Sequence, residues 1–160
     1  MKAPPPLIRA ALELIDEAFE KKAWHGPNLH GAIRGLRAAE AAWRPGPGRH
    51  SVWELVVHAA YWKYAVRRRL SGEKRGSFAL AGSNWFPRPD APDEKAWAAD
   101  VRLLVAEHRK LRAVVAGLRD RDLDQAAAGQ RTTGRVLVRG IAAHDLYHAG
   151  QIQLLKRLRH

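Results

Sequence analysis

The segment His144-Asp145-Leu146-Tyr147-His148 carries two histidines four residues apart in a stretch with a helical pattern. On an α-helix this spacing puts the second imidazole about 6 Å further along the axis and about 40° round it. Two imidazoles so placed can reach one metal ion from one face. That face is predicted to be buried, because apolar residues recur around the pair at three- and four-residue intervals: Leu137, Ile141, His144, His148, Gln151, Leu155 and Leu158. The pair is therefore expected to point into a helical protein and to need a third ligand.

The third ligand must come from a histidine, a carboxylate or water, because the chain has no cysteine. His58 and His108 each lie on the apolar stripe of a predicted helix. His58 with the 144/148 pair would supply three neutral imidazoles, which suit Zn, Ni, Fe or Mn and leave a position open. An ion held in this way keeps its full charge and can activate water or bind a thiolate. His108 is a fourth candidate, and hydrogen-bonded core histidines are the alternative for every one of these positions.

Repeated three-four spacing of apolar residues predicts an all-α four-helix bundle, and 160 residues fit a single domain, residues 1–160. The long helices are expected at about residues 7–24, 51–70 and 133–158, with another that begins between residues 90 and 93 and ends near residue 118. A shorter helical run, residues 29–43, follows Gly26-Pro27 and could form one bent arm with the first helix. Ser51 and Glu54 make a capping box, and Thr133 is a plausible N-cap.

Residues 72–92 are predicted to be a long loop, because glycine and proline recur through them. Phe78, Trp85 and Phe86 lie in this loop. A long loop with three aromatic residues is typical either of a lid packed over the bundle or of a wall of a binding site.

The net charge of +12 would attract an anionic substrate or nucleic acid. The densest basic stretch is Arg67-Arg68-Arg69 with Lys74-Arg75. Three consecutive helical residues point in three directions, so this stretch favours a solvated surface, and nucleic acid is an unlikely partner. The absence of cysteine, of a secretory leader and of any membrane-length apolar run favours a cytoplasmic protein that does not enter the membrane.

Two longer motifs resemble the DinB-like superfamily of metal-binding helical proteins. These motifs are the twelve residues from Ser51 to Trp62 and the nine residues from His144 to Ile152, with Trp43-Arg44-Pro45 and Leu70-Ser71-Gly72 flanking the first. The resemblance covers most of the chain in order. It implies a four-helix bundle of up-down-down-up order in which one histidine of the second bundle helix and the last helix's pair bind a divalent metal. In this sequence those residues are His58, His144 and His148.

The resemblance also implies a metal-dependent hydrolase or a transferase that uses a low-molecular-weight thiol, a small-molecule substrate, and a homodimer. A non-enzymatic basic module that binds nucleic acid or another anionic partner is the alternative function, and a dimeric scaffold is a third. His-Asp-x-x-His also approaches the His-Glu-x-x-His pattern of zinc proteases, but nothing else around Asp145 favours a protease.

The neighbours of the three histidines each have more than one candidate role. Gln151, Asp145 and Trp62 are candidates for the layer that surrounds the ligands. Gln151 could instead be polar packing at the bundle end, and Trp62 a core aromatic. Asp145 and Tyr147 are expected to face neighbouring helices, and His108 to be a core or rim histidine. The remaining histidines are expected at a helix end or at the surface: His25, His30, His50 and His160.

Overall fold

A computed structural model describes residues 3–126 and 131–159. Four long helices form the bundle: α1 (Pro6–Phe19), α4 (Val52–Ser71), α5 (Glu94–Ala116) and α7 (Gly134–Leu158). Three short helices lie in the connections: α2 (Leu29–Ile33), α3 (Ala38–Ala42) and α6 (Asp120–Leu123). None of the described helices has the length and apolar character needed to cross a membrane.

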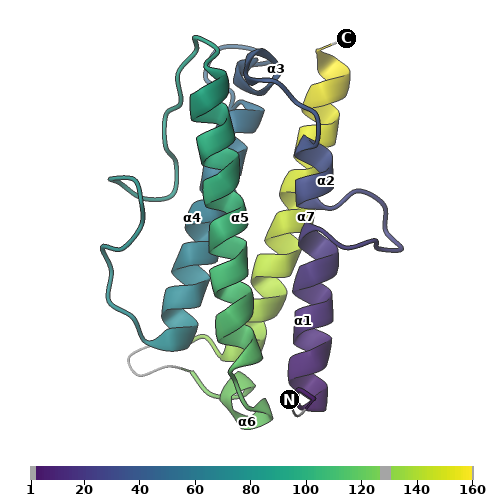
Figure 1. Cartoon of the computed structure of the whole chain (residues 1–160), viewed down its shortest axis with the longest axis vertical. Helices are drawn as coiled ribbons and strands as arrows, with labels where there is room; N and C mark the ends of the chain where they lie inside the picture. The colour runs from purple at the N-terminus through teal and green to yellow at the C-terminus, as the bar shows by residue number, and fades with distance from the viewer. Residues whose placement is uncertain (1–2, 127–130, 160) are drawn as a thin grey trace.

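The four long helices run up, down, down and up, which confirms the expected order (Figure 1). α4 and α5 run in the same direction because the connection between them, residues 72–93, climbs the outside of the bundle back to the end where α4 begins. The helices pack as a ring in which α4 contacts α5 and α7, and α1 contacts α5 and α7. This ring brings α4 beside the last helix, although more than 60 residues separate them in the sequence.

The helix starts follow the predicted capping chemistry. The Glu54 amide donates to Ser51 Oγ and the Ser51 amide donates to the Glu54 carboxylate, both at 3.2 Å, so the capping box forms. Asp93 caps α5 through the amides of Lys95 and Ala96. α4 ends at Gly72, whose φ of 75° lies in the left-handed region that glycine adopts without strain.

The first helix is shorter than predicted, since it ends at Phe19 and not near residue 24. The amides of Glu20 and Lys21 both donate to the Asp16 carbonyl, which turns the chain away from the helix axis. Trp24 is fully exposed, so the apolar stripe does not continue. The first helix and the run at residues 29–43 do not form one bent arm, because the second run divides into α2 and α3 at Gly35, whose φ is 76°.

Two apolar clusters fill the bundle, one toward the α2–α3 end and one toward the α6 end. Between them lies a group of buried polar side chains, one from each long helix: Asp16, Lys63, His108 and Asp145. His108 is a core histidine, as expected, and its ring stacks on Phe19 with centroids 3.9 Å apart. Burial, together with the nearby Lys63 ammonium, lowers the pKa of His108 to about 3.

Candidate metal centre

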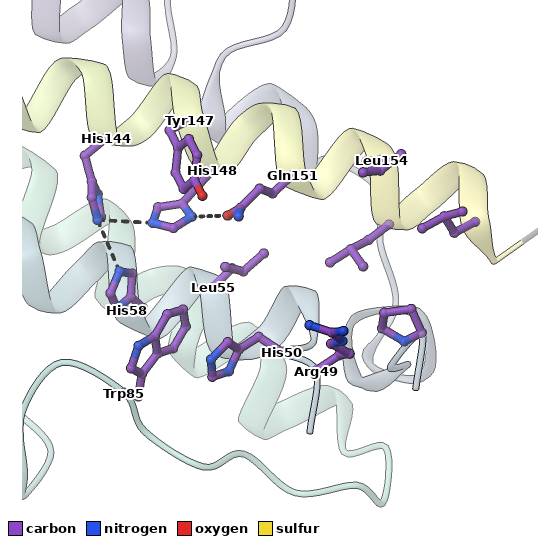
Figure 2. A pocket seen from close by; sticks show the side chains of 13 residues that line it. Arg49, His50, Leu55, His58, Trp85, His144, Tyr147, His148, Gln151 and Leu154 are labelled. Carbon is purple, nitrogen blue, oxygen red and sulfur yellow. Dashed lines mark hydrogen bonds between the residues drawn. The ribbon is translucent and has the colours of Figure 1, made fainter. Parts of the chain in front are cut away.

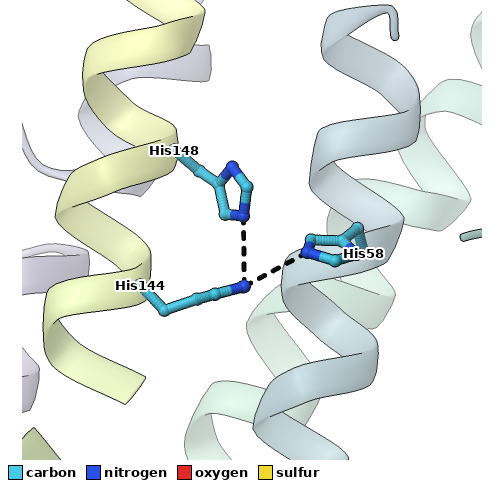
Figure 3. A group of neighbouring side chains, drawn as sticks. All are labelled: His58, His144 and His148. Atoms are coloured by element: carbon cyan, nitrogen blue, oxygen red, sulfur yellow. Dashed lines mark hydrogen bonds between the residues drawn. The ribbon is translucent and has the colours of Figure 1, made fainter. Parts of the chain in front are cut away.

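His58 of α4 meets His144 and His148 of α7 where the two helices pack against each other (Figure 3). The Nε2 atom of His144 lies 3.2 Å from His58 Nε2 and 3.1 Å from His148 Nε2. One ligand atom from each histidine lies within 4.8 Å of the others. The three imidazoles expected to form a site therefore converge on one point.

These separations fit a shared metal ion. Two nitrogens each bonded at 2.0–2.1 Å to one ion lie about 3.4 Å apart at the tetrahedral angle and about 2.9 Å apart at a right angle. The two observed separations fall between those limits. The geometry is thus compatible with four-coordinate or six-coordinate binding, with one or more positions left for another ligand.

Hydrogen bonds at Nδ1 determine which nitrogen is free in two of the rings. His58 Nδ1 donates to the Asn84 carbonyl oxygen at 2.8 Å, and His148 Nδ1 donates to Gln151 Oε1 at 2.6 Å. A neutral imidazole carries one proton, so Nε2 of both rings must present a lone pair. This is the tautomer that a metal ligand needs.

His144 lies between the other two histidines and cannot donate a hydrogen bond to the Nε2 lone pairs of both. If His144 carries its proton on Nε2, it can donate to only one of its two neighbours. If it carries the proton on Nδ1, three lone pairs face each other at about 3 Å, and Nδ1 is itself buried without a partner among the described residues. A cation at the common point would satisfy all three nitrogens, so the donor set fits a divalent ion.

The environment keeps the imidazoles neutral. Burial, together with the adjacent His148 and His58, lowers the pKa of His144 to about 3. Burial also lowers the pKa of His148 to about 4, against the opposing hydrogen bond to Gln151. The pKa of His58 is lowered, again mainly by burial. At neutral pH no proton therefore competes with a metal for these lone pairs.

The loop before α5 holds His58 in place. Asn84 has a φ of 64°, an unusual left-handed conformation for a residue other than glycine. Its side-chain oxygen accepts a hydrogen bond from Trp62 Nε1 at 2.9 Å while its carbonyl accepts from His58. Trp62 thus supports His58 through Asn84, and its ring also lies 6.2 Å from that of His144.

Trp85 connects the same loop to the site by stacking. Its ring lies between two imidazoles, with centroids 3.9 Å from His58 and 3.6 Å from His50. His50 Nδ1 in turn contacts the Glu54 carboxylate at 3.1 Å. The loop therefore serves both of the roles considered for it, because Phe78 and Phe86 pack against the bundle while Trp85 walls the site.

The three imidazoles stand at one end of an elongated pocket of about 590 Å³ that runs along α7 (Figure 2). Its lining is mostly apolar and aromatic, with the histidines at one end and one arginine toward the other. The lining residues are Pro45, Arg49, His50, Leu55, His58, Trp85, His144, Tyr147, His148, Gln151, Leu154, Leu155 and Leu158. The histidines are accordingly accessible to a small molecule.

Several residues near the site differ from expectation. Asp145 faces a neighbouring helix, as expected, but its buried carboxylate contacts Lys63 of α4 and not one of the three histidines, so it is not part of the layer around them. Tyr147 does not face a neighbouring helix but is 64% exposed at the pocket, and Leu158 is also exposed. His30 is half-buried against Phe19. These residues lie on helix flanks, where spacing alone does not distinguish a neighbouring helix from a cleft.

The basic stretch does not form one surface. Arg67 is buried, and its guanidinium contacts Glu73 and Glu107, whereas Arg68 and Arg69 lie further outward on α4. Residues that sequence reasoning did not place in the site are Asn84, His50 and Arg49. No pattern in the sequence marks Asn84, because its role depends on a backbone carbonyl. His160 lies outside the described residues.

Comparison with known proteins agrees with the helical fold. The crystal structure of a conserved protein from Enterococcus faecalis superposes with a TM-score of 0.66 at 19% sequence identity, covering 95% of this chain and 96% of that one. No protein of curated function matches this sequence. The sequence pattern of the DinB superfamily matches residues 23–152, a segment that includes all three histidines. The chain therefore belongs to the DinB superfamily.

Proposed function

We propose that this protein is a metal-dependent enzyme in which His58, His144 and His148 hold a divalent ion, such as Zn, Ni, Fe or Mn, at the end of the pocket. The observation that carries the proposal is the convergence of three Nε2 atoms, two of them with tautomers set by hydrogen bonds to Asn84 and Gln151. A bound divalent ion supplies Lewis acidity, which lowers the pKa of water or a thiol at its open position.

The lining favours a thiol over water as the activated group. The pocket lining is mostly apolar, and a thiolate is a softer and more weakly hydrated ligand than hydroxide. A thiol loses its proton on coordination to a divalent ion. His50 lines the pocket with Nδ1 directed at Glu54, so its Nε2 is available to accept that proton. We therefore favour a thiol-dependent transferase of small molecules, with hydrolysis as the second candidate.

Metal analysis of protein purified without an affinity tag tests whether the three histidines bind a metal ion. The chain should bind one equivalent of divalent metal after reconstitution, and His148→Ala should lose it. His25→Ala is the matched control, since it removes an exposed imidazole far from the site in sequence and should retain the metal. Full metal content in His148→Ala would refute the proposed ligand set.

A cobalt-loaded sample separates the two reaction classes. Addition of 3-mercaptopropanoate should produce a thiolate-to-cobalt charge-transfer absorption in the near ultraviolet. If cobalt binds through the three histidines and no such band appears at saturating thiol, the thiol assignment is wrong and hydrolysis takes its place.

A further inference from the structure

The pocket has three chemically distinct regions: the imidazoles, an apolar region along α7, and the charged side chain of Arg49. The imidazoles occupy one end, and Gln151, Leu154, Leu155 and Leu158 follow along the helix toward the other (Figure 2). His148 and Leu155 are seven residues apart, so the apolar region extends about 10 Å beyond the histidines. Leu55 of α4 lines the same region from the opposite helix. A ligand that fills the pocket must therefore be elongated, with an apolar body.

Arg49 lies toward the end of the pocket away from the histidines (Figure 2). It is the one lining residue with a permanent charge among the described residues. Arg44, which contacts the Arg49 carbonyl, pairs with both Glu54 and Asp90, so these two carboxylates are already engaged. No carboxylate in the described part of the chain pairs with the Arg49 guanidinium. The charge is therefore available to a ligand.

The backbone around Arg49 is fixed even though its side chain is free. Its amide donates to the Gly46 carbonyl at 3.2 Å, and its carbonyl accepts from Arg44 Nη1 at 2.9 Å. Gly48 has a φ of 68°, which the turn requires. A guanidinium presented from a fixed turn loses less entropy when it binds an anion than one on a mobile loop.

We infer that the substrate of this site is an elongated organic anion: a reactive group at the histidine end, an apolar segment about 10 Å long over the leucines, and a carboxylate or phosphate paired with Arg49. The inference rests on the proposed function, because the reactive end is assigned by the metal site. Arg49 is accordingly a specificity residue and takes no part in bond making.

Three thiols of graded chemistry test this inference on the cobalt-loaded protein, with the charge-transfer band reporting the dissociation constant. 8-Mercaptooctanoate carries the full set of features, 8-mercaptooctan-1-ol lacks the charge, and 3-mercaptopropanoate lacks the apolar body. The long acid should bind at least ten-fold more tightly than the short one, because the added methylenes lie against leucines. It should bind about five-fold more tightly than the alcohol, the size expected of a solvent-accessible ion pair.

Two variants with matched controls locate these effects. Arg49→Gln should abolish the preference for the acid over the alcohol, whereas Arg157→Gln, which removes an exposed arginine of α7 outside the lining, should leave it unchanged. Leu154→Ser should weaken the long acid and spare the short one. Val136→Ser, at an exposed position of the same helix far from the pocket, should affect neither.

The outcomes separate the inference from the function on which it depends. If cobalt fails to bind through the histidines, the proposed function fails. If cobalt and all three thiols bind but the acid and the alcohol bind equally, or if Arg157→Gln reduces the preference as much as Arg49→Gln, the inference is wrong and the function stands. A preference that declines with added salt and depends on Arg49 alone supports it.

Discussion

The buried pair of Lys63 and Asp145 is expected to be the most sensitive polar contact in the bundle. Both side chains are 1% exposed, and Lys63 Nζ contacts Asp145 Oδ2. The ammonium also lies 4.5 Å from the ring centroid of Phe19 and 3.4 Å from His108 Nδ1. Because Asp145 adjoins His144, this contact between α4 and α7 helps to set the rotation of α7 that turns the histidines toward His58.

Burial favours the neutral forms of Lys63 and Asp145, and each side chain favours the charged form of the other. Burial raises the pKa of Asp145 to about 6, and the ammonium prevents a larger rise. Burial lowers the pKa of Lys63, and the carboxylate opposes that change. At pH 7 the Asp145 carboxyl is therefore mostly ionised beside Lys63, and removal of either partner leaves the other buried without its counter-charge.

Breaking a buried ion pair by removing one partner costs about 3–5 kcal/mol of unfolding free energy. Asp145→Asn preserves the shape of the side chain and removes its charge, so it isolates this effect. Lys63→Met should cost a similar amount for the same reason. The double variant leaves no uncompensated charge, so it should cost clearly less than the sum of the two single variants.

Urea unfolding of the metal-free protein at pH 7, followed by circular dichroism, measures these energies. Asp124→Asn is the matched control. It breaks the Arg135–Asp124 pair, whose side chains are 40% and 63% exposed, and should cost less than about 1 kcal/mol. Single variants that lose no more than the control, or a double variant whose loss equals the sum, would refute the assignment of a coupled buried pair.

Three further predictions concern the site and its pH dependence. The metal-free protein should lose stability on acidification from pH 6.5 to 4, because the pKa of His108 and of His144 is lowered to about 3 and that of His148 to about 4, so the unfolded chain binds protons that the folded chain does not. The buried Asp145 carboxyl has the opposite effect, because its raised pKa lets the folded chain bind one proton that the unfolded chain does not. Three histidines less this one carboxyl leave a net difference of about two protons. Urea titrations that show no pH dependence would contradict this prediction. Gln151→Leu should weaken metal binding about 10- to 100-fold because His148 Nδ1 loses its acceptor, whereas Gln151→Glu should retain most of the affinity in a competition titration. Asn84→Ala should weaken metal binding more than Asn84→Gly does, since glycine adopts the positive φ without strain and so keeps the carbonyl that holds His58; equal losses would indicate that the backbone conformation is unimportant.

The local features of this protein were predicted correctly from residues close together in the chain, whereas the meeting of His58 with the last helix was expected from the family resemblance as well. The capping box at Ser51 and Glu54 is such a feature, because both hydrogen bonds form within one turn. The spacing of His144 and His148 likewise places two imidazoles on one face of any helix. The length of α1 was not predictable in this way, since its end depends on how the chain turns after Phe19 and packs Leu29 into the core.

The amino-acid sequence by itself thus determined the helical bundle, the imidazole chemistry of the candidate metal site and the face of α7 that carries two of its three histidines. Only the tertiary structure decided what surrounds those histidines: the Asn84 carbonyl on His58, the Trp85 ring between two imidazoles, and Arg49 toward the other end of the pocket. The physical reason is that periodicity describes one helix at a time. Contacts made by loop backbone, and the difference between a buried flank and an open cleft, arise only when distant segments pack together.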